Sequence, residues 1–386
     1  MTRIVGVLLL VNAYLFTSPF IFVNVPVGPL ALLLNVMLAG FLYYTNSGIE
    51  KKYILFMISI LVGYCISSLY WQDYGLIHYS KFLLLAFIIV PLLNQKQKNS
   101  FTSLSSYYLL LQVSFAIVGF LYAFSGGGAI FELVSSSGRV YKLFLTTISV
   151  TGYSNFIRPS GFFDEPGALS FAICSVVLLR NIYGFDKKVS YYLLIGGLVT
   201  LSLAHFIFLM FYVAYDLFLN RSRSVLLLIM GIFAMPVIFA VFFDGYEVVA
   251  NYYFSRTANG LSGDGRSTLL YNAIEYLEAS PSLTYLFGID SNCLTDFTNN
   301  CRFIYPRMGE NFLSPLVFGG FITSWPYYFV IMLCTIYLLR SPKTFILYFA
   351  FFILFLQRPY IFNYSYSFLW VLALVEMISH NKNHGK

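Results

Sequence analysis

Charged residues are scarce in this chain, and their scarcity decides the class of protein. Only 10% of the 386 residues are Asp, Glu, Lys or Arg, against 59% that are hydrophobic, and the mean hydropathy is +0.76. Soluble domains contain roughly 25% charged residues, so this sequence has too little charge to cover a water-facing surface. A soluble globular protein is therefore excluded.

Metal-binding and processing signals are also missing. The chain has four histidines, and its acids are scattered without an HExxH or DxD run, so neither a metal ion nor another cofactor is expected. The apolar run from Ile4 to Val23 is not followed by a cleavage site and a soluble mature domain. We expect this run to be the first membrane span.

Long apolar runs recur along the whole sequence, and they are continuous rather than alternating, which favours spanning helices over a barrel. We expect an all-α polytopic integral membrane protein, one helical domain over residues 1–386 with about twelve transmembrane helices. Tyr191 to Leu219 is either two short helices broken near Ser202–His205 or one long tilted helix. The expected spans are 4–23, 27–45, 53–70, 76–93, 104–124, 166–183, 189–203, 205–220, 224–243, 312–338, 343–357 and 360–379.

The basic residues are distributed unevenly between the two sides of the expected topology. The net charge of +7 is read through the positive-inside rule and not as a sign of nucleic-acid binding. With the N-terminus inside, the inner connections are short and basic, and both termini are expected in the cytoplasm. These inner connections hold 14 of the 23 basic residues: Arg3, Lys51, Lys52, Lys96, Lys98, Arg180, Lys187, Lys188, Arg221, Arg223, Arg340, Lys343, Lys382 and Lys386.

Nine basic residues remain on the outer side, against that bias. Seven of them are arginines, whose planar fork binds phosphate in a way that lysine cannot match. The alternative is salt bridging with the twelve acids expected on the same side. The nine are Lys81, Arg139, Lys142, Arg158, Arg256, Arg266, Arg302, Arg307 and Arg358.

The longer of two long outer loops, residues 244–311, carries two features. Cys293 and Cys301 share it, and an oxidising exterior would favour their pairing as a disulfide, the alternative being two free thiols. Residues 263–267, GDGRS, precede an apolar stripe at helical spacing and predict a helix start. Arg266 at that start would favour an anion, unless the segment is an ordinary helix cap with an incidental arginine.

The other long outer loop, residues 125–165, ends in the most informative stretch of the chain. Residues 139–150 predict a short amphipathic helix on the membrane surface. Residues 158–167, RPSGFFDEPG, then place an arginine, a tight turn, two aromatics and two acids directly before a span. Capping of that span accounts for one of the acids, Asp164 or Glu165, but not for the pair or for Arg158.

These motifs resemble those of the O-antigen polymerase (Wzy) family and its relatives, the O-antigen ligases. The likeness rests on RPSGFFDEPG before a span, GDGRS in a late outer loop, GENFLSPLVFGGF at 309–321 and QRPY at 357–360. The topology covers the whole chain, and the local motifs cover about forty residues. The ligases typically carry a histidine where this sequence has Glu310, and that departure disfavours a ligase.

The resemblance implies a GT-C-type membrane glycosyltransferase that joins oligosaccharide repeat units carried on undecaprenyl pyrophosphate. Such enzymes work at the periplasmic face of the bacterial inner membrane, among membrane lipids, and the family suggests a length-regulating partner protein. By likeness to the ligases, Arg158 and Arg266 would bind the pyrophosphate. Arg307 and Arg358 are further candidates for the same role.

The remaining chemical requirement is a base for the incoming hydroxyl group. Glu165 is the first choice, Asp164 the second and Glu310 the third. Alternatively, Asp164 or Glu165 only orients Arg158, and Glu310 only pairs with Arg307. Two polar residues within spans have simpler interpretations: His205 as a packed polar contact, and Asp216 as the partner of Arg221 and Arg223.

Two rival functions stay open. A flippase or other transporter of lipid-linked oligosaccharides also has about twelve spans, but transporters often show repeated halves and charges at the membrane midplane. The second rival is the ligase, which transfers the chain to a lipid core instead of extending it.

Overall fold

A computed structural model gives the fold of the chain. It describes residues 2–24, 27–46, 51–72, 75–135, 139–150, 157–218, 229, 265–289, 311–340, 342–357 and 364–384.

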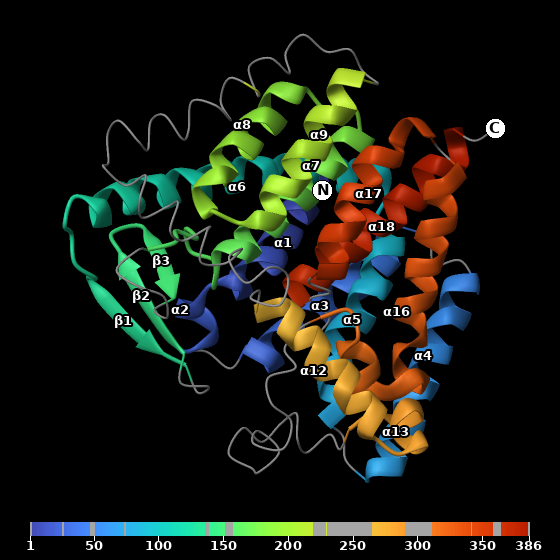
Figure 1. Cartoon of the computed structure of the whole chain (residues 1–386). Helices are drawn as coiled ribbons and strands as arrows, with labels where there is room; N and C mark the ends of the chain where they lie inside the picture. The colour runs from blue at the N-terminus through green and yellow to red at the C-terminus, as the bar shows by residue number, and fades with distance from the viewer. Residues whose placement is uncertain are drawn as a thin grey trace.

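The described chain is predominantly helical, with one small sheet (Figure 1). The chain also contains two short 3-10 helices, η1 (Leu15–Thr17) and η2 (Leu198–Thr200). The helices are α1 (Thr2–Tyr14), α2 (Pro19–Phe22), α3 (Val27–Thr45), α4 (Lys51–Trp71), α5 (Gly75–Leu92), α6 (Gln95–Phe124), α7 (Pro166–Ile182), α8 (Lys187–Gly197), α9 (Leu203–Phe218), α12 (Gly265–Ala279), α13 (Ser282–Phe287), α16 (Ser314–Arg340), α17 (Pro342–Gln357) and α18 (Tyr364–His384).

Three described helical segments are long and apolar enough to cross a membrane: Tyr53–Trp71, Gln95–Phe124 and Ser314–Ile336. Shorter apolar helices accompany them, so the structure is that of a helical protein with membrane-length segments. The expected spans within the described ranges fall on helices, while the span at 224–243 lies outside the described residues. The total of twelve stays a prediction.

The first expected span, 4–23, is interrupted. Helix α1 ends at Tyr14, and after η1 the chain takes an extended conformation at Ser18 before the short α2. The cause is Pro19, which disfavours the helical conformation for the residue before it and lacks the N–H that would continue the ladder.

Helix α7 occupies the centre of the bundle. Fourteen of its residues are buried, from Pro166 through Arg180 with the exception of Gly167. It packs against α6, α8, α9, α17 and α18. Large buried side chains such as Phe171, Phe351 and Trp370 fill the surrounding core. A helix that is apolar on every side is suited to this buried position, because it has no polar face to present to water.

The prediction of an amphipathic helix at 139–150 is wrong. Residues 131–150 form an antiparallel sheet in the order β1-β2-β3, which stands to one side of the helices, next to α2 (Figure 1). Its strands are β1 (Phe131–Val134), β2 (Val140–Phe144) and β3 (Thr147–Val150).

The composition of the segment explains the error. Valine, tyrosine, phenylalanine, threonine and isoleucine dominate it, and these residues favour strands. Leu145 takes a left-handed conformation, φ +53°, and closes a two-residue turn between β2 and β3. The aromatic pairs Phe20–Phe131 and Phe22–Tyr141 then anchor the sheet on α2. The fold is therefore not all-α in its described part.

The chain from Tyr191 onward forms two helices, as the first of the two alternatives predicted. Helix α8 ends in η2, and Leu201 follows with φ +50° before α9 begins. Because both helices are apolar and packed, the break lies inside the protein, where irregular backbone is tolerated in a membrane protein. Thr200, Ser202 and His205 are all buried there.

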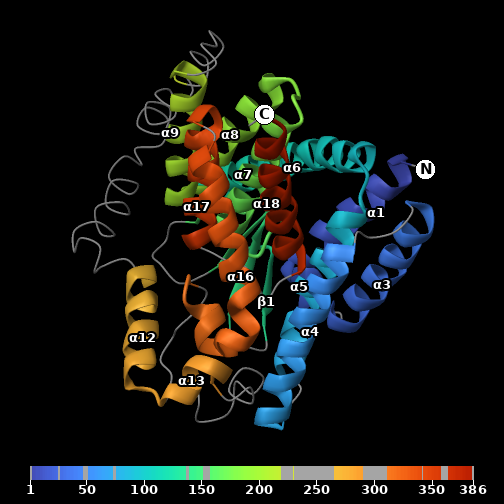
Figure 2. The ribbon, with the colours of Figure 1, turned by 90° about the vertical axis from the view of Figure 1, so that its right-hand side faces the viewer.

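The helix expected after GDGRS is confirmed as α12, which begins at Gly265. Its Ala273 and Leu277 pack with Ile289 and Val317, beside α13 and α16 in the lower part of Figure 2. Leu270, part of the expected apolar stripe, is instead exposed.

Two glycines allow α13 and α16 to touch backbone to backbone. Gly320, within GENFLSPLVFGGF, has φ +63° and kinks α16. A Cβ atom there would lie 2.2 Å from the Leu286 carbonyl oxygen, and one at Gly288 would lie 2.5 Å from that of Phe318. Only glycine satisfies both the conformation and the close approach.

Candidate active site

The RPSGFFDE stretch forms a tight, fully bonded turn against the sheet. Ser160 Oγ lies within hydrogen-bond distance of the carbonyl oxygens of Ile148 (2.8 Å) and Phe163 (2.7 Å), which share its single O–H donor. The backbone N–H groups of Ser160 and Gly161 both donate to Thr147 Oγ1. The predicted tight turn is confirmed, and the sheet that sequence analysis missed is what holds it.

Gly161 is required at the apex of this turn. Its φ is +59°, and an added Cβ would lie 2.7 Å from Gln112 Oε1 and 2.8 Å from the Gln112 carbonyl oxygen. Gln112 Oε1 also accepts a hydrogen bond from the N–H of Phe162 (2.9 Å). Helix α6 therefore fixes the turn from one side while β3 fixes it from the other.

Asp164 lies where three distant segments meet. Its N–H donates to the carbonyl of Thr17 (3.0 Å), at the end of η1. Its Oδ1 accepts a hydrogen bond of 2.7 Å from Tyr366 Oη of α18, a residue 202 positions away in sequence. We call residues 158–165, together with Thr17 and Tyr366, the turn junction.

Glu165 stands at the N-cap of α7 but does not cap it. Its backbone is extended and its side chain makes no capping hydrogen bond, while Pro166 occupies the first helical position. The residue is half-buried. Capping by hydrogen bonding therefore does not account for Glu165, although both carboxylates lie near the positive end of the α7 dipole.

Arg139 is a site residue that sequence analysis did not single out. It is exposed immediately before β2, yet it interacts electrostatically with Glu165 and Asp164. Loss of hydration lowers the pKa of the Arg139 guanidinium, but Tyr141 and the two carboxylates together raise it by more. Burial raises the pKa of the neighbouring Tyr141. No sequence signal could have found this interaction, because it depends on the unpredicted sheet.

Arg158 approaches the helix break from the other side of the turn junction. Its Nη2 donates to the carbonyl oxygens of Thr200 (3.4 Å) and Leu201 (3.3 Å). Its backbone N–H donates to Ser149 Oγ (3.3 Å), which ties it to β3. The side chain is half-buried.

The structure describes the other predicted site residues only in part or not at all. Arg266 is the second residue of α12, and its side chain is outside the described part. Glu310, Arg307 and Arg358 lie outside the described residues, as do Cys293 and Cys301, so their roles stay predictions. Asn311, next to Glu310 in sequence, is buried and donates to the Leu269 carbonyl oxygen, linking α16 to α12.

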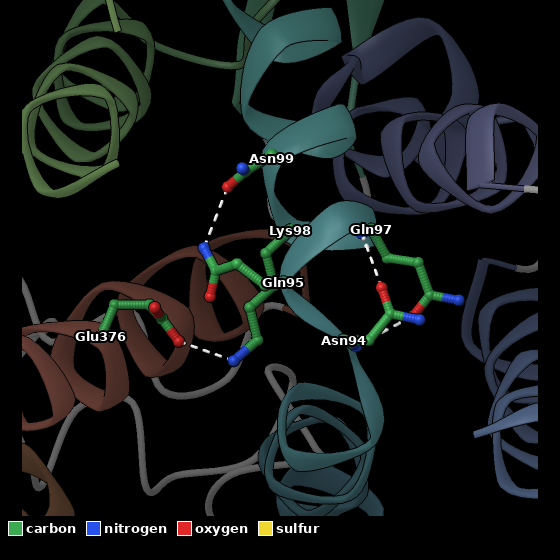
Figure 3. Close-up of polar contacts among 6 residues, drawn as sticks. All are labelled: Asn94, Gln95, Gln97, Lys98, Asn99 and Glu376. Carbon is green, nitrogen blue, oxygen red and sulfur yellow. Dashed lines mark hydrogen bonds and ion pairs between the residues drawn. The ribbon is translucent and has the colours of Figure 1, made fainter. Parts of the chain in front are cut away.

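A second polar region lies at the other end of α7, about 25 Å away at 1.5 Å per residue. Lys98 pairs with Glu376 (2.6 Å) beside the capping box of α6, in which Asn94 and Gln97 bond reciprocally (Figure 3). We call Lys98, Arg180, Lys187, Asp216 and Glu376 the paired-charge end.

Asp216 belongs to this end, where the described residues give it two partners that were not predicted. It pairs with Lys187 and accepts a hydrogen bond from Tyr191 Oη (2.5 Å). Arg221 and Arg223 lie outside the described residues. Lys187 comes from the start of α8, which packing brings beside the end of α9.

Arg180 is buried at the same end with its donors occupied by neutral groups. It donates to Ser190 Oγ, Ser106 Oγ and the carbonyl of Asp186, at 3.0, 3.0 and 2.6 Å. His205, by contrast, lies at the helix break, buried, with Nε2 2.8 Å from the Leu194 carbonyl oxygen. The predicted packed contact is confirmed for His205.

The three cysteines of the described part differ in burial. Cys174 and Cys334 are buried, while Cys65 is exposed on α4. Within the described ranges, no three His, Cys, Asp or Glu side chains gather closely enough to hold a metal ion.

Scans against protein-family models, characterised proteins and solved structures find no match for this chain. The resemblance drawn from the motifs therefore stays a prediction.

Proposed function

We propose that this chain is a membrane glycosyltransferase that polymerises oligosaccharide repeat units carried on a polyprenyl pyrophosphate. The observation that carries the proposal is the turn junction: two adjacent carboxylates at the start of α7, with Arg139 and Arg158 nearby. Acids beside guanidinium groups suit a reaction that needs a base and a site for a leaving anion.

In the proposed reaction, the acceptor sugar hydroxyl attacks the anomeric carbon of the donor chain. The new C–O bond forms as the bond to the lipid pyrophosphate breaks, the hydroxyl proton passes to a carboxylate, and the pyrophosphate leaves with the bonding electron pair. Glu165 is the better base, because Asp164 is held by the Tyr366 hydroxyl. Arg158 and Arg266 would stabilise the charge on the leaving group, each contact worth roughly 1.5–3 kcal/mol.

The distribution of basic residues supports the proposed sidedness. Arg139 and Arg158 lie toward the start of α7, whereas Lys98 and Arg180 lie toward its end. These are the two groups that the positive-inside rule assigns to opposite faces. We therefore propose a multi-pass protein of the bacterial inner membrane with about twelve spans, cytoplasmic termini, a periplasmic active site and a GT-C-type architecture.

The test is the surface glycan of a strain that lacks this gene. Single-repeat material that becomes a ladder on complementation supports the polymerase. Unmodified lipid core indicates a ligase or a flippase and contradicts the proposal. A purified sample tests the chemistry directly: polyprenyl-pyrophosphate oligosaccharide should be elongated by the wild-type chain, and a flippase would leave it unchanged.

A further inference from the structure

We propose that the break between α8 and α9 is a positioning element for Arg158, which holds the guanidinium ready for an anionic diphosphate group. The inference rests on the proposed function for its ligand, but the placement of Arg158 can be tested without that ligand. The break is residues 198–202, and it includes η2 and the left-handed Leu201.

The contacts between Arg158 and the break are made to its backbone. Nη2 lies 3.4 Å from the Thr200 carbonyl oxygen and 3.3 Å from that of Leu201. These carbonyls are exposed to a partner because the helix stops: a continuing helix would use them for its own ladder. The break therefore creates the acceptors that Arg158 uses.

The conformation of Leu201 is unusual for a bulky residue. A left-handed φ of +50° is uncommon outside glycine, asparagine and aspartate, and it persists only when its surroundings impose it. Nothing in the local sequence requires it, since neither glycine nor proline occurs within residues 198–202. Tertiary contacts must hold the break open.

His205 and Gly197 supply such contacts. The His205 ring crosses the break and places Nε2 2.8 Å from the Leu194 carbonyl oxygen of α8. A Cβ atom on Gly197 would lie 2.2 Å from the His205 ring, so any residue other than glycine would clash with the ring in this position. Thr200 Oγ1 donates to the Gly197 carbonyl (2.8 Å) and closes the end of η2.

The type of acceptor has a chemical consequence. A carbonyl oxygen orients a guanidinium through its dipole and carries no net charge that would neutralise it, unlike a carboxylate. The contacts with Thr200 and Leu201 thus fix the direction of Arg158 without placing a negative charge beside it. A diphosphate is the anion that the proposed reaction provides.

The first experiment measures the reactivity of Arg158 in the purified full chain by mass spectrometry after treatment with phenylglyoxal, an arginine reagent. Leu201→Gly keeps the left-handed conformation and should leave the labelling rate within twofold of wild type. Leu201→Val should raise it severalfold, because a β-branched residue disfavours that conformation. Leu145→Val is the matched control: Leu145 is also left-handed, with φ +53°, but lies in the exposed hairpin.

A second pair of variants reaches the break through the His205 ring. Gly197→Ala should displace the ring and raise Arg158 labelling, as Leu201→Val does. Gly40→Ala should have no effect, since a Cβ at Gly40 meets nothing within 4 Å. Labelling of Arg158 that is unchanged in both Leu201→Val and Gly197→Ala, in chains that retain wild-type circular dichroism, would overturn the inference.

The second experiment uses inorganic pyrophosphate as the probe. Protection of Arg158 from the reagent by pyrophosphate, weakened about tenfold in Leu201→Val and Gly197→Ala, supports the inference together with its ligand. If the variants alter labelling but pyrophosphate protects no chain, the positioning role stands and the diphosphate ligand, with the proposed function, is contradicted.

Discussion

The two ends of α7 differ in the described partners of their acids. At the paired-charge end, Lys98 meets Glu376 and Lys187 meets Asp216 in direct ion pairs, and each acid is almost fully buried. At the turn junction, the described bonds of Arg158 go to backbone carbonyls and that of Asp164 to a tyrosine hydroxyl.

This difference separates a structural use of charge from a chemical one. A buried ion pair offsets its own desolvation cost and offers nothing further to a ligand. A hydrogen bond from or to a neutral group orients a charge near a reacting atom without itself cancelling that charge. The turn junction should therefore govern activity and the paired-charge end stability.

Arg158→Ala is the change expected to have the largest effect. Removing a group that stabilises charge in the transition state typically lowers the rate about 100- to 1000-fold. Elongation of a lipid-linked oligosaccharide by purified protein measures it, and Arg158→Lys should recover only part of the rate because lysine lacks the two-pronged fork. Full activity in both variants would remove Arg158 from the mechanism.

Lys187→Met tests the other end of the helix. It removes the described cationic partner of Asp216, whose side chain has 0% exposure, and keeps the hydrogen bond from Tyr191. We expect a loss of about 2–3 kcal/mol in unfolding free energy, below the full cost of an unpaired buried charge because Lys187 is one-third exposed.

The measurement is thermal unfolding in detergent, with turnover measured below the transition. Asp216→Leu combined with Lys187→Met should restore most of the stability. A large fall in turnover with unchanged stability would reverse the division of labour between the two ends.

Tyr366→Phe removes one hydrogen bond from Asp164 while keeping the ring in its packed position. Since bonds to charged groups are worth roughly 1.5–3 kcal/mol, turnover should fall about tenfold. Tyr348→Phe is the control, because its hydroxyl lies 2.8 Å from His380 Nδ1, toward the C-terminal end of α18. Equal losses of turnover in the two variants would mean that the hydrogen bond to Asp164 makes no specific contribution to activity.

Arg139→Ala should have the smallest effect. Its side chain is exposed, so its attraction to Asp164 and Glu165 is screened by solvent and salt. We expect a fall in turnover of about threefold at low ionic strength that disappears near 1 M salt. Lys142→Ala is the matched control, since Lys142 pairs with Glu132 across the sheet and not with Asp164 or Glu165. A salt-independent loss would point to direct contact with substrate.

The acid pair and the preference for Glu165 over Asp164 as the base were predicted from the sequence, but the contact that distinguishes the two was not. The hydrogen bond from Tyr366 to Asp164 joins residues 202 positions apart, and no local pattern encodes such a contact. The same limit explains Asp216, whose pairing with Lys187 from the preceding helix was not predicted. In each case the polar group was found correctly and its partner was decided by helix packing.

The sequence by itself determined the membrane-length helices, the start of α7 at Pro166 and the start of α12 at Gly265. These depend on hydropathy and on the conformational limits of proline and glycine, which act over a few residues. Only the tertiary structure decided that residues 131–150 form a sheet, that this sheet brings Arg139 beside the acids, and that Arg158 rests on the open carbonyls of a broken helix. Such contacts depend on which surfaces pack together, and that choice is made by the whole chain.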